Sequence, residues 1–134
     1  MSVQKQKNAT YVFKYDITGG DSGSIAAHSL GTLPKNFVIT QTWIHVLTTC
    51  TSATDAATMS VGYTGAATAF EAATAISTGT TWDAAAPRVS DAGADGIVAN
   101  FITAAAGDDI IVTVAVEVVT AGKFLVVVEG YIGA

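Results

Sequence analysis

The sequence contains few of the residues that build catalytic or metal sites. Its 134 residues include one cysteine and two histidines, whereas a zinc site takes about four nitrogen or sulfur ligands. The lone Cys50 also excludes a disulfide within the chain, which fits assembly in a reducing cytoplasm. His45 and Cys50 stand an odd number of positions apart on one expected strand, hence on opposite faces, which disfavours a Cys–His nucleophile pair. We therefore expect no cofactor and no enzymatic activity, with Cys50 as a small core or rim residue.

Charged residues are scarce and long apolar runs are missing. Only 13% of the residues are charged and 50% are hydrophobic, a composition that favours contact with other subunits. No apolar run approaches the ~20 residues that span a bilayer, and the N-terminus lacks the apolar core of a signal peptide. Residues 36–122 carry Arg88 as their one basic residue against eight acids. We therefore expect no membrane and no direct nucleic-acid partner, because phosphate contacts need clustered Lys and Arg.

The first ten residues differ from the rest in composition. Residues 1–10 are polar and basic, with Lys5 and Lys7, and we predict a flexible arm followed by one domain over residues 11–134. Two interpretations of the arm stay open, a solvated tail or a contact with an acidic neighbour.

Alternating apolar and polar residues, separated by clusters of Gly, Asp, Thr and Ser, predict an all-β fold. Asn36 and Asp55 are expected in turns, and the strand after Asp55 is expected to run antiparallel to the strand before it. The alanine-rich stretch 65–77 predicts one short helix, because alanine has the highest helix propensity. Strands are expected over residues 10–17, 25–30, 36–50, 58–63, 96–103, 108–119 and 124–134.

The last two expected strands form a hairpin with its turn at Gly122, and both faces of that hairpin are largely apolar. A sheet with one solvent-exposed face normally shows a clearer alternation of apolar and polar residues. We therefore expect the second face of this hairpin to be buried against another subunit. The predicted oligomer interface contains Leu125, Val127 and Tyr131.

The region 80–96 is the longest irregular stretch, which makes it a candidate surface-binding loop around Trp82 and Arg88. Asp91 and Asp95 in this region, and the pair Asp108 and Asp109, lack the spacing of a calcium loop and are expected in solvated turns.

Three stretches carry a resemblance to a known family: "LGTLPKNFVIT", "TTCTSATDAATMSVGY" with the alanine-rich segment after it, and "ITAAAGDDIIVTVAVEVVTAGKFLVVVEGYI". The spacing of their expected strands and the sequences of their turns resemble those of the small jelly-roll virion proteins of tailed bacteriophages. The resemblance is greatest to the capsid decoration, or cement, proteins. The resemblance implies an antiparallel β-sandwich of jelly-roll type that forms a homotrimer on the outer capsid surface. It also implies binding across major capsid protein subunits, with residues 1–10 as a capsid-contact arm through Lys5 and Lys7.

Two other functions stay open. A head-fibre or tail-fibre module that binds a host glycan or receptor would share the sandwich, and Trp82 would then contact the ligand. A small hydrolase on a β-sandwich is a third possibility, because paired carboxylates can meet only in the fold.

Overall fold

The computed structural model describes residues 7–76, 82, 89–91, 101–102 and 107–132. These residues form strands and turns. The strands are β1 (Lys7–Asp16), β2 (Ala27–Thr32), β3 (Phe37–Ser52), β4 (Thr58–Tyr63), β5 (Ala66–Ala75), β6 (Val89–Asp91), β7 (Phe101–Ile102), β8 (Asp109–Ala115) and β9 (Val119–Ile132).

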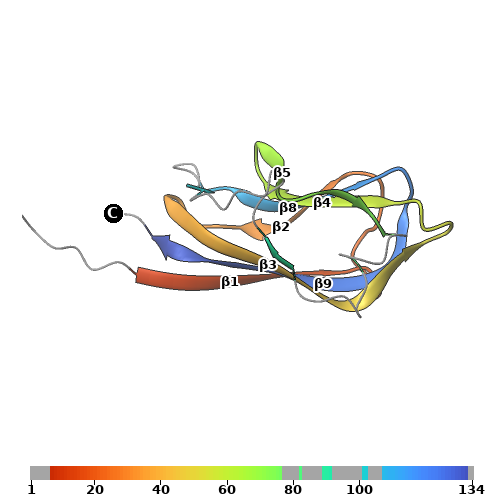
Figure 1. Cartoon of the computed structure of the whole chain (residues 1–134), viewed down its shortest axis with the longest axis horizontal. Coiled ribbons are helices and arrows are strands. Elements are labelled where there is room, and N and C mark those ends of the chain that lie inside the picture. Colours follow the sequence, from red (N-terminus) through yellow and green to blue (C-terminus); the bar gives the residue numbers. More distant parts are fainter. Residues whose placement is uncertain (1–6, 77–81, 83–88, 92–100, 103–106, 133–134) are drawn as a thin grey trace, which may run out of the picture.

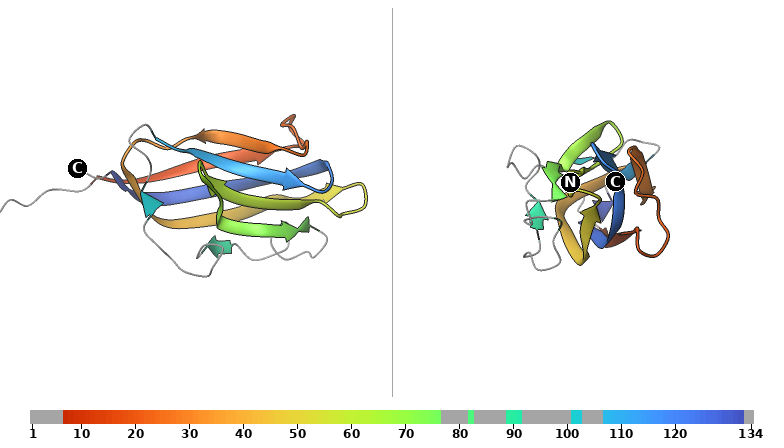
Figure 2. Two further views of the ribbon diagram at one scale, coloured as in Figure 1. Left: turned by 90° about the horizontal axis from the view of Figure 1, so that it is seen from above. Right: turned by 90° about the vertical axis from the view of Figure 1, so that its right-hand side faces the viewer.

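The strands form two antiparallel sheets that pack face to face, as Figures 1 and 2 show. Sheet A has the order β1-β9-β3-β6, with β7 also paired to β3, and sheet B has the order β2-β8-β4-β5. The predicted all-β sandwich is thus confirmed, and the alternation of strands between the two sheets is compatible with a jelly roll. β1 begins and β9 ends at the same end of the sandwich, because Lys7 pairs with Ile132.

The core lies between the two sheets and is built by alternate residues of the long strands. In β8 the burial alternates strictly, with Ile110, Val112 and Val114 turned inward. In β9 the inward residues are Phe124 and Val126, followed by Val128. Two-sided alternation of this kind is what a strand with one buried face requires.

A bulge explains the mixed faces of β3. Phe37 and Ile39 face the core, but the register shifts between Ile39 and Gln41. From there on, Thr42 and Ile44 face the core. One extra residue moves every later side chain to the opposite face, so the alternation expected for the whole strand is wrong across this point.

The predicted helix over residues 65–77 is wrong, because this segment contains β5. Its hydrogen bonds go to β4, with register shifts on either side of Val61. Pairing with an open sheet edge overrides the helix propensity of alanine. The shifts break the two-residue period, so the sequence shows no clear strand pattern there, although Phe70 is fully buried.

The predicted hairpin around Gly122 is also wrong. Gly122 lies inside β9 with a φ of 140°, and the chain turns earlier, at residues 116–118, where Val116 has a φ of 72°. β8 and β9 belong to different sheets. β3 and β4 likewise lie in different sheets and do not pair as expected. Asn36 and Asp55 do lie in turns, as expected, with φ of 55° and 57°.

Residues 7–10, which the prediction assigned to a flexible arm, belong to a strand. β1 starts at Lys7, and residues 7–10 pair with the end of β9. Lys5 lies outside the described residues.

Candidate interaction surface

The outer face of sheet A carries side chains of β1, β9 and β3 that point away from the core. Register places three apolar residues in one row across the strands, with Val12 opposite Val127 and Val127 opposite Trp43. The next row holds Lys14, Leu125 and His45. Val12 is 58% exposed, and Val127, Leu125 and Trp43 are partly exposed.

All three residues of the predicted interface lie on this face. Leu125, Val127 and Tyr131 alternate with buried residues along β9 and are each partly exposed. Trp43 and Val12, which the sequence did not assign to the interface, extend the same surface through cross-strand pairing. The apolar patch therefore depends on strand order, which brings residues from distant parts of the chain together.

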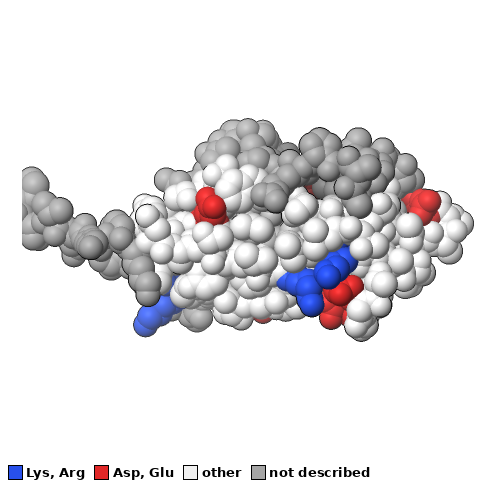
Figure 3. Space-filling view, turned by 90° about the horizontal axis from the view of Figure 1, so that it is seen from below, with Lys and Arg blue, Asp and Glu red and all other residues white. Residues whose placement is uncertain are grey.

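Charge is sparse on this side of the molecule. Figure 3 shows the face from below, mostly uncharged, with basic side chains beside an acidic group and a few separate charged groups nearer its edges. Lys123 pairs in register with Asp16, and Lys14 lies opposite Leu125. A largely uncharged sheet face with exposed valine and partly exposed tryptophan has the composition of a protein contact surface.

A shallow hollow borders the same face near the chain ends. It has a volume of about 490 Å³ and is lined by Asn8, Ala9, Thr10, Thr40, Glu129, Gly130 and Tyr131. The Thr40 hydroxyl, at the bulge of β3, donates to the Glu129 carbonyl at 3.2 Å. The bulge thus fixes one wall of this hollow beside the predicted interface residue Tyr131.

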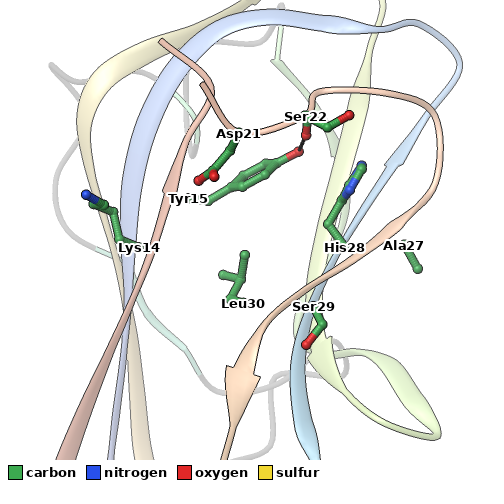
Figure 4. Close-up of a pocket in the computed structure, with 8 residues that line it drawn as sticks. All are labelled: Lys14, Tyr15, Asp21, Ser22, Ala27, His28, Ser29 and Leu30. Carbon is green, nitrogen blue, oxygen red and sulfur yellow. Dashed lines mark hydrogen bonds between the residues drawn. The ribbon is translucent and has the colours of Figure 1, made fainter. Parts of the chain in front are cut away.

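A second hollow, of about 400 Å³, lies at the open side of the sandwich between β1 and β2. Figure 4 shows Tyr15, His28 and Leu30 pointing into it from the two sheets. The Tyr15 hydroxyl donates to the Ser22 carbonyl, and the Tyr15 and His28 rings lie 5.7 Å apart. Burial, followed by the charge of Asp21, raises the pKa of Tyr15 to about 12, so this hydroxyl stays protonated.

Trp82 is a core residue, and its assignment to a surface-binding loop is wrong. It is 1% exposed, its ring lies 4.9 Å from that of Phe124, and its carbonyl accepts a hydrogen bond from the Cys50 amide at 2.9 Å. The sequence around it, with threonines before the tryptophan and an aspartate and alanines after it, gives no signal of this burial. Arg88, its predicted partner, lies outside the described residues, as does Lys5, and only the backbone of Lys7 is described.

Two carboxylates of the described region, those of Glu117 and Asp109, accept hydrogen bonds from hydroxyl groups. Glu117 accepts hydrogen bonds from the Thr54 amide at 2.6 Å and the Thr54 hydroxyl at 2.5 Å, which lower the pKa of Glu117. Asp109 accepts from Thr32 at 2.6 Å and from Ser29 at 3.1 Å. Both carboxylates thereby connect segments that lie far apart in the sequence.

Asp108 is buried, with 8% exposure. The solvated turn that we expected is therefore wrong for this residue.

The Cys50 thiol is poorly placed for chemistry. It is buried, and burial raises its pKa to about 12, which keeps it from ionising. His45 lies on the outer face while Cys50 faces the core, as the sequence predicted. Within the described residues, no group of three or more His, Cys, Asp or Glu side chains is placed to hold a metal ion.

Within the described part of the chain, no helix is long and apolar enough to cross a membrane.

Comparison with known proteins shows the fold. No protein-family model matches the chain, and no curated protein matches it. Three solved structures resemble it, beginning with a chain of the cyanophage Pam1 capsid asymmetric unit, with a TM-score of 0.70, 17% identity and coverage of 99% of this chain and 93% of that chain. A chain of the acidic stable capsid of Helicobacter pylori bacteriophage KHP30 has a TM-score of 0.62 at 14% identity, with coverage of 97% and 95%. A chain of the capsid of Ralstonia phage GP4 has a TM-score of 0.65 at 17% identity, with coverage of 96% and 86%. The protein therefore has a β-sandwich fold that also occurs in chains of phage capsid structures.

Proposed function

We propose that the chain is a structural virion protein that decorates and stabilises a phage capsid from its outer surface. In this proposal it forms a homotrimer and binds across neighbouring major capsid protein subunits after assembly in the host cytoplasm. The observation that carries the proposal is the match of nearly the whole fold to chains of three phage capsids. The sparsely charged, partly apolar outer face of sheet A supports it, because that face offers a contact surface.

Decoration stabilises a shell by mass action. A protein that binds the assembled shell and not the separated subunits shifts the equilibrium toward the shell. Three copies on a three-fold lattice position bind together, so each contact can be weak while the total is strong. No single deep pocket is needed for this role.

The outer face of sheet A is the proposed subunit interface, with Leu125, Val127 and Tyr131 as predicted and with Trp43 and Val12 added. Val127→Lys tests it, since Val127 is central in the apolar row and a lysine there would place a charge inside the contact. We expect light scattering to give a trimer for the wild type and a smaller species for V127K. Thr120→Lys, a change at an exposed position of the same strand, is the matched control and should leave the trimer intact.

Binding to shells tests the function itself. Purified protein should sediment with assembled capsids of its own phage, saturably, and should stay in the supernatant with unassembled capsid protein. If the protein remains in the supernatant with intact capsids, the proposal is refuted. Removal of residues 1–6 should weaken sedimentation if the basic arm contacts the shell, and should leave the trimer unchanged.

The fibre-module alternative loses the residue on which it rested, since Trp82 is buried and cannot stack on a glycan. Binding of wild-type protein to a host glycan array, without binding to capsids, would restore that alternative.

A further inference from the structure

β1 has one side that no other described strand pairs with, at the edge of sheet A. β1 is the terminal strand of that sheet, and its ten residues pair with β9 in unbroken register. It contains no proline and no bulge, two of the devices that blunt an edge strand, and it is longer than a typical strand of about five or six residues. The edge is therefore long and regular enough for another strand to pair with it.

The backbone direction of this edge follows from Asp16. Its amide donates to the Asp21 carboxylate at 2.8 Å, and its carbonyl accepts from the Asp21 amide at 2.9 Å. Both groups thus point away from β9. Because residues alternate along an antiparallel pair, the amide and carbonyl groups of Asn8, Thr10, Val12 and Lys14 point the same way. All four residues are exposed.

The hollow of about 400 Å³ opens beside this edge. Its wall on the β1 side is Tyr15, and its wall on the β2 side is formed by His28 and Leu30. The bond from the Tyr15 hydroxyl to the Ser22 carbonyl limits it at one end. Next to Leu30, β2 approaches β1 closely at Gly31, where an added Cβ would lie 2.8 Å from the Phe13 ring. A strand added to β1 would direct every second side chain toward this space.

We propose that an extended segment of the capsid shell protein adds to the β1 edge as a further strand of sheet A. The segment would place a side chain with an apolar stem and a polar end in the hollow, against the Tyr15 and His28 rings. An acidic residue would lie beside Lys14, whose neighbour within the sheet is the apolar Leu125. Main-chain bonds provide affinity in this mode of recognition, and the side-chain hollow provides specificity. This inference rests on the proposed function and names the contact by which the shell would be bound.

A second copy of β1 does not fit the edge equally well. The inward side chains of β1, Phe13 and Tyr15, are buried in their own core and could not fill the hollow of a neighbour. Pairing of two β1 strands antiparallel to each other would also be a two-fold contact, which does not close a three-fold assembly.

Thr10→Pro tests the edge directly. The Thr10 amide points away from β9, so proline removes no bond of the folded chain but blocks a bond to an added strand. We expect T10P to keep its native mass and to bind capsids about tenfold more weakly, the loss of roughly one main-chain bond with its steric clash. Thr10→Val, which keeps the amide, is the matched control and should bind like the wild type.

Amide hydrogen exchange on the wild-type protein gives a second measurement that does not depend on the variant folding. On capsids, the amides of Asn8, Thr10, Val12 and Lys14 should exchange more slowly, while those of Tyr11 and Phe13 are already protected by β9. Unchanged exchange at these four amides, or full capsid binding by T10P, overturns the inference and leaves the proposed function standing. Loss of the oligomer in T10P would assign the edge to a second copy and also overturn it. Failure of the wild type to bind capsids refutes the proposed function, and the inference with it.

Discussion

Truncation of Trp82 should lower the stability of the fold, whereas truncation of Trp43 should mainly weaken the oligomer. Trp82 is 1% exposed and packs on Phe124, so Trp82→Ala removes a large buried side chain, which typically costs about 3–5 kcal/mol. For 134 residues, an unfolding entropy of about 2.1 cal/mol/K per residue gives roughly 0.28 kcal/mol/K. The same cost therefore lowers Tm by about 11–18 °C.

Trp43→Ala is the matched control for this prediction. Trp43 lies on the outer face of sheet A and is partly exposed, so its truncation should cost the monomer about 1 kcal/mol, or roughly 4 °C by the same conversion. Its main effect should be on the oligomer. Thermal unfolding followed by circular dichroism on dilute protein measures both variants. A Tm for W82A within about 4 °C of the wild type would refute the placement of Trp82 in the core.

Three further predictions concern single side chains. Because hydrogen bonds from Thr54 hold the pKa of Glu117 below its usual 4.5, folding favours the ionised carboxylate. The stabilisation is complete above that value and is lost as pH falls through the lower folded-state pKa. Glu117→Gln should therefore weaken the acid dependence of the urea midpoint, and an unchanged dependence would contradict the contact. Cys50, with its pKa raised to about 12 by burial, should react with a thiol reagent at about pH 8 only after denaturation, whereas rapid native labelling would place it at the surface. Gly122→Ala should cost about 1–3 kcal/mol, since its Cβ would lie 2.6 Å from the Cys50 sulfur at a φ of 140°. Cys50→Ala combined with G122A should cost less than the sum of the two single changes, and strict additivity would contradict the clash.

Strict alternation of apolar and polar residues predicted the strands that bury one face in the core. The regular stretches of β1, β8 and β9 follow a two-residue period of burial, so the alternation of the sequence was enough to indicate strands there. Asn36 and Asp55 were predictable as turn residues because few other side chains tolerate a positive φ.

The wrong predictions concern features that depend on strand pairing or on contacts between residues far apart in the sequence. β5 binds an open edge with shifted register, so its sequence keeps alanine and loses the alternation that would reveal a strand. Gly122 looks like a turn residue, but its positive φ serves a close approach to Cys50 inside β9. Trp82 stands among polar residues, and only the three-dimensional fold brings it onto Phe124.

The interaction surface was predictable in part. Leu125, Val127 and Tyr131 were identified because their strand is apolar on both faces. Trp43 and Val12 join them only through the order β1-β9-β3, which no local pattern contains. The hollow between Tyr15 and His28 depends in the same way on two edge strands from different sheets.

Heating of capsids with and without the bound protein tests whether the protein stabilises the capsid. Capsids of its own phage, filled with DNA, would be stripped of the protein, divided in two, and one half re-saturated with purified chain. Release of DNA would then be followed with an intercalating dye as the temperature rises. We expect re-saturated capsids to retain the protein and to release DNA at a higher temperature than stripped ones. Equal release temperatures, with no protein retained on the capsids, would contradict the proposed function.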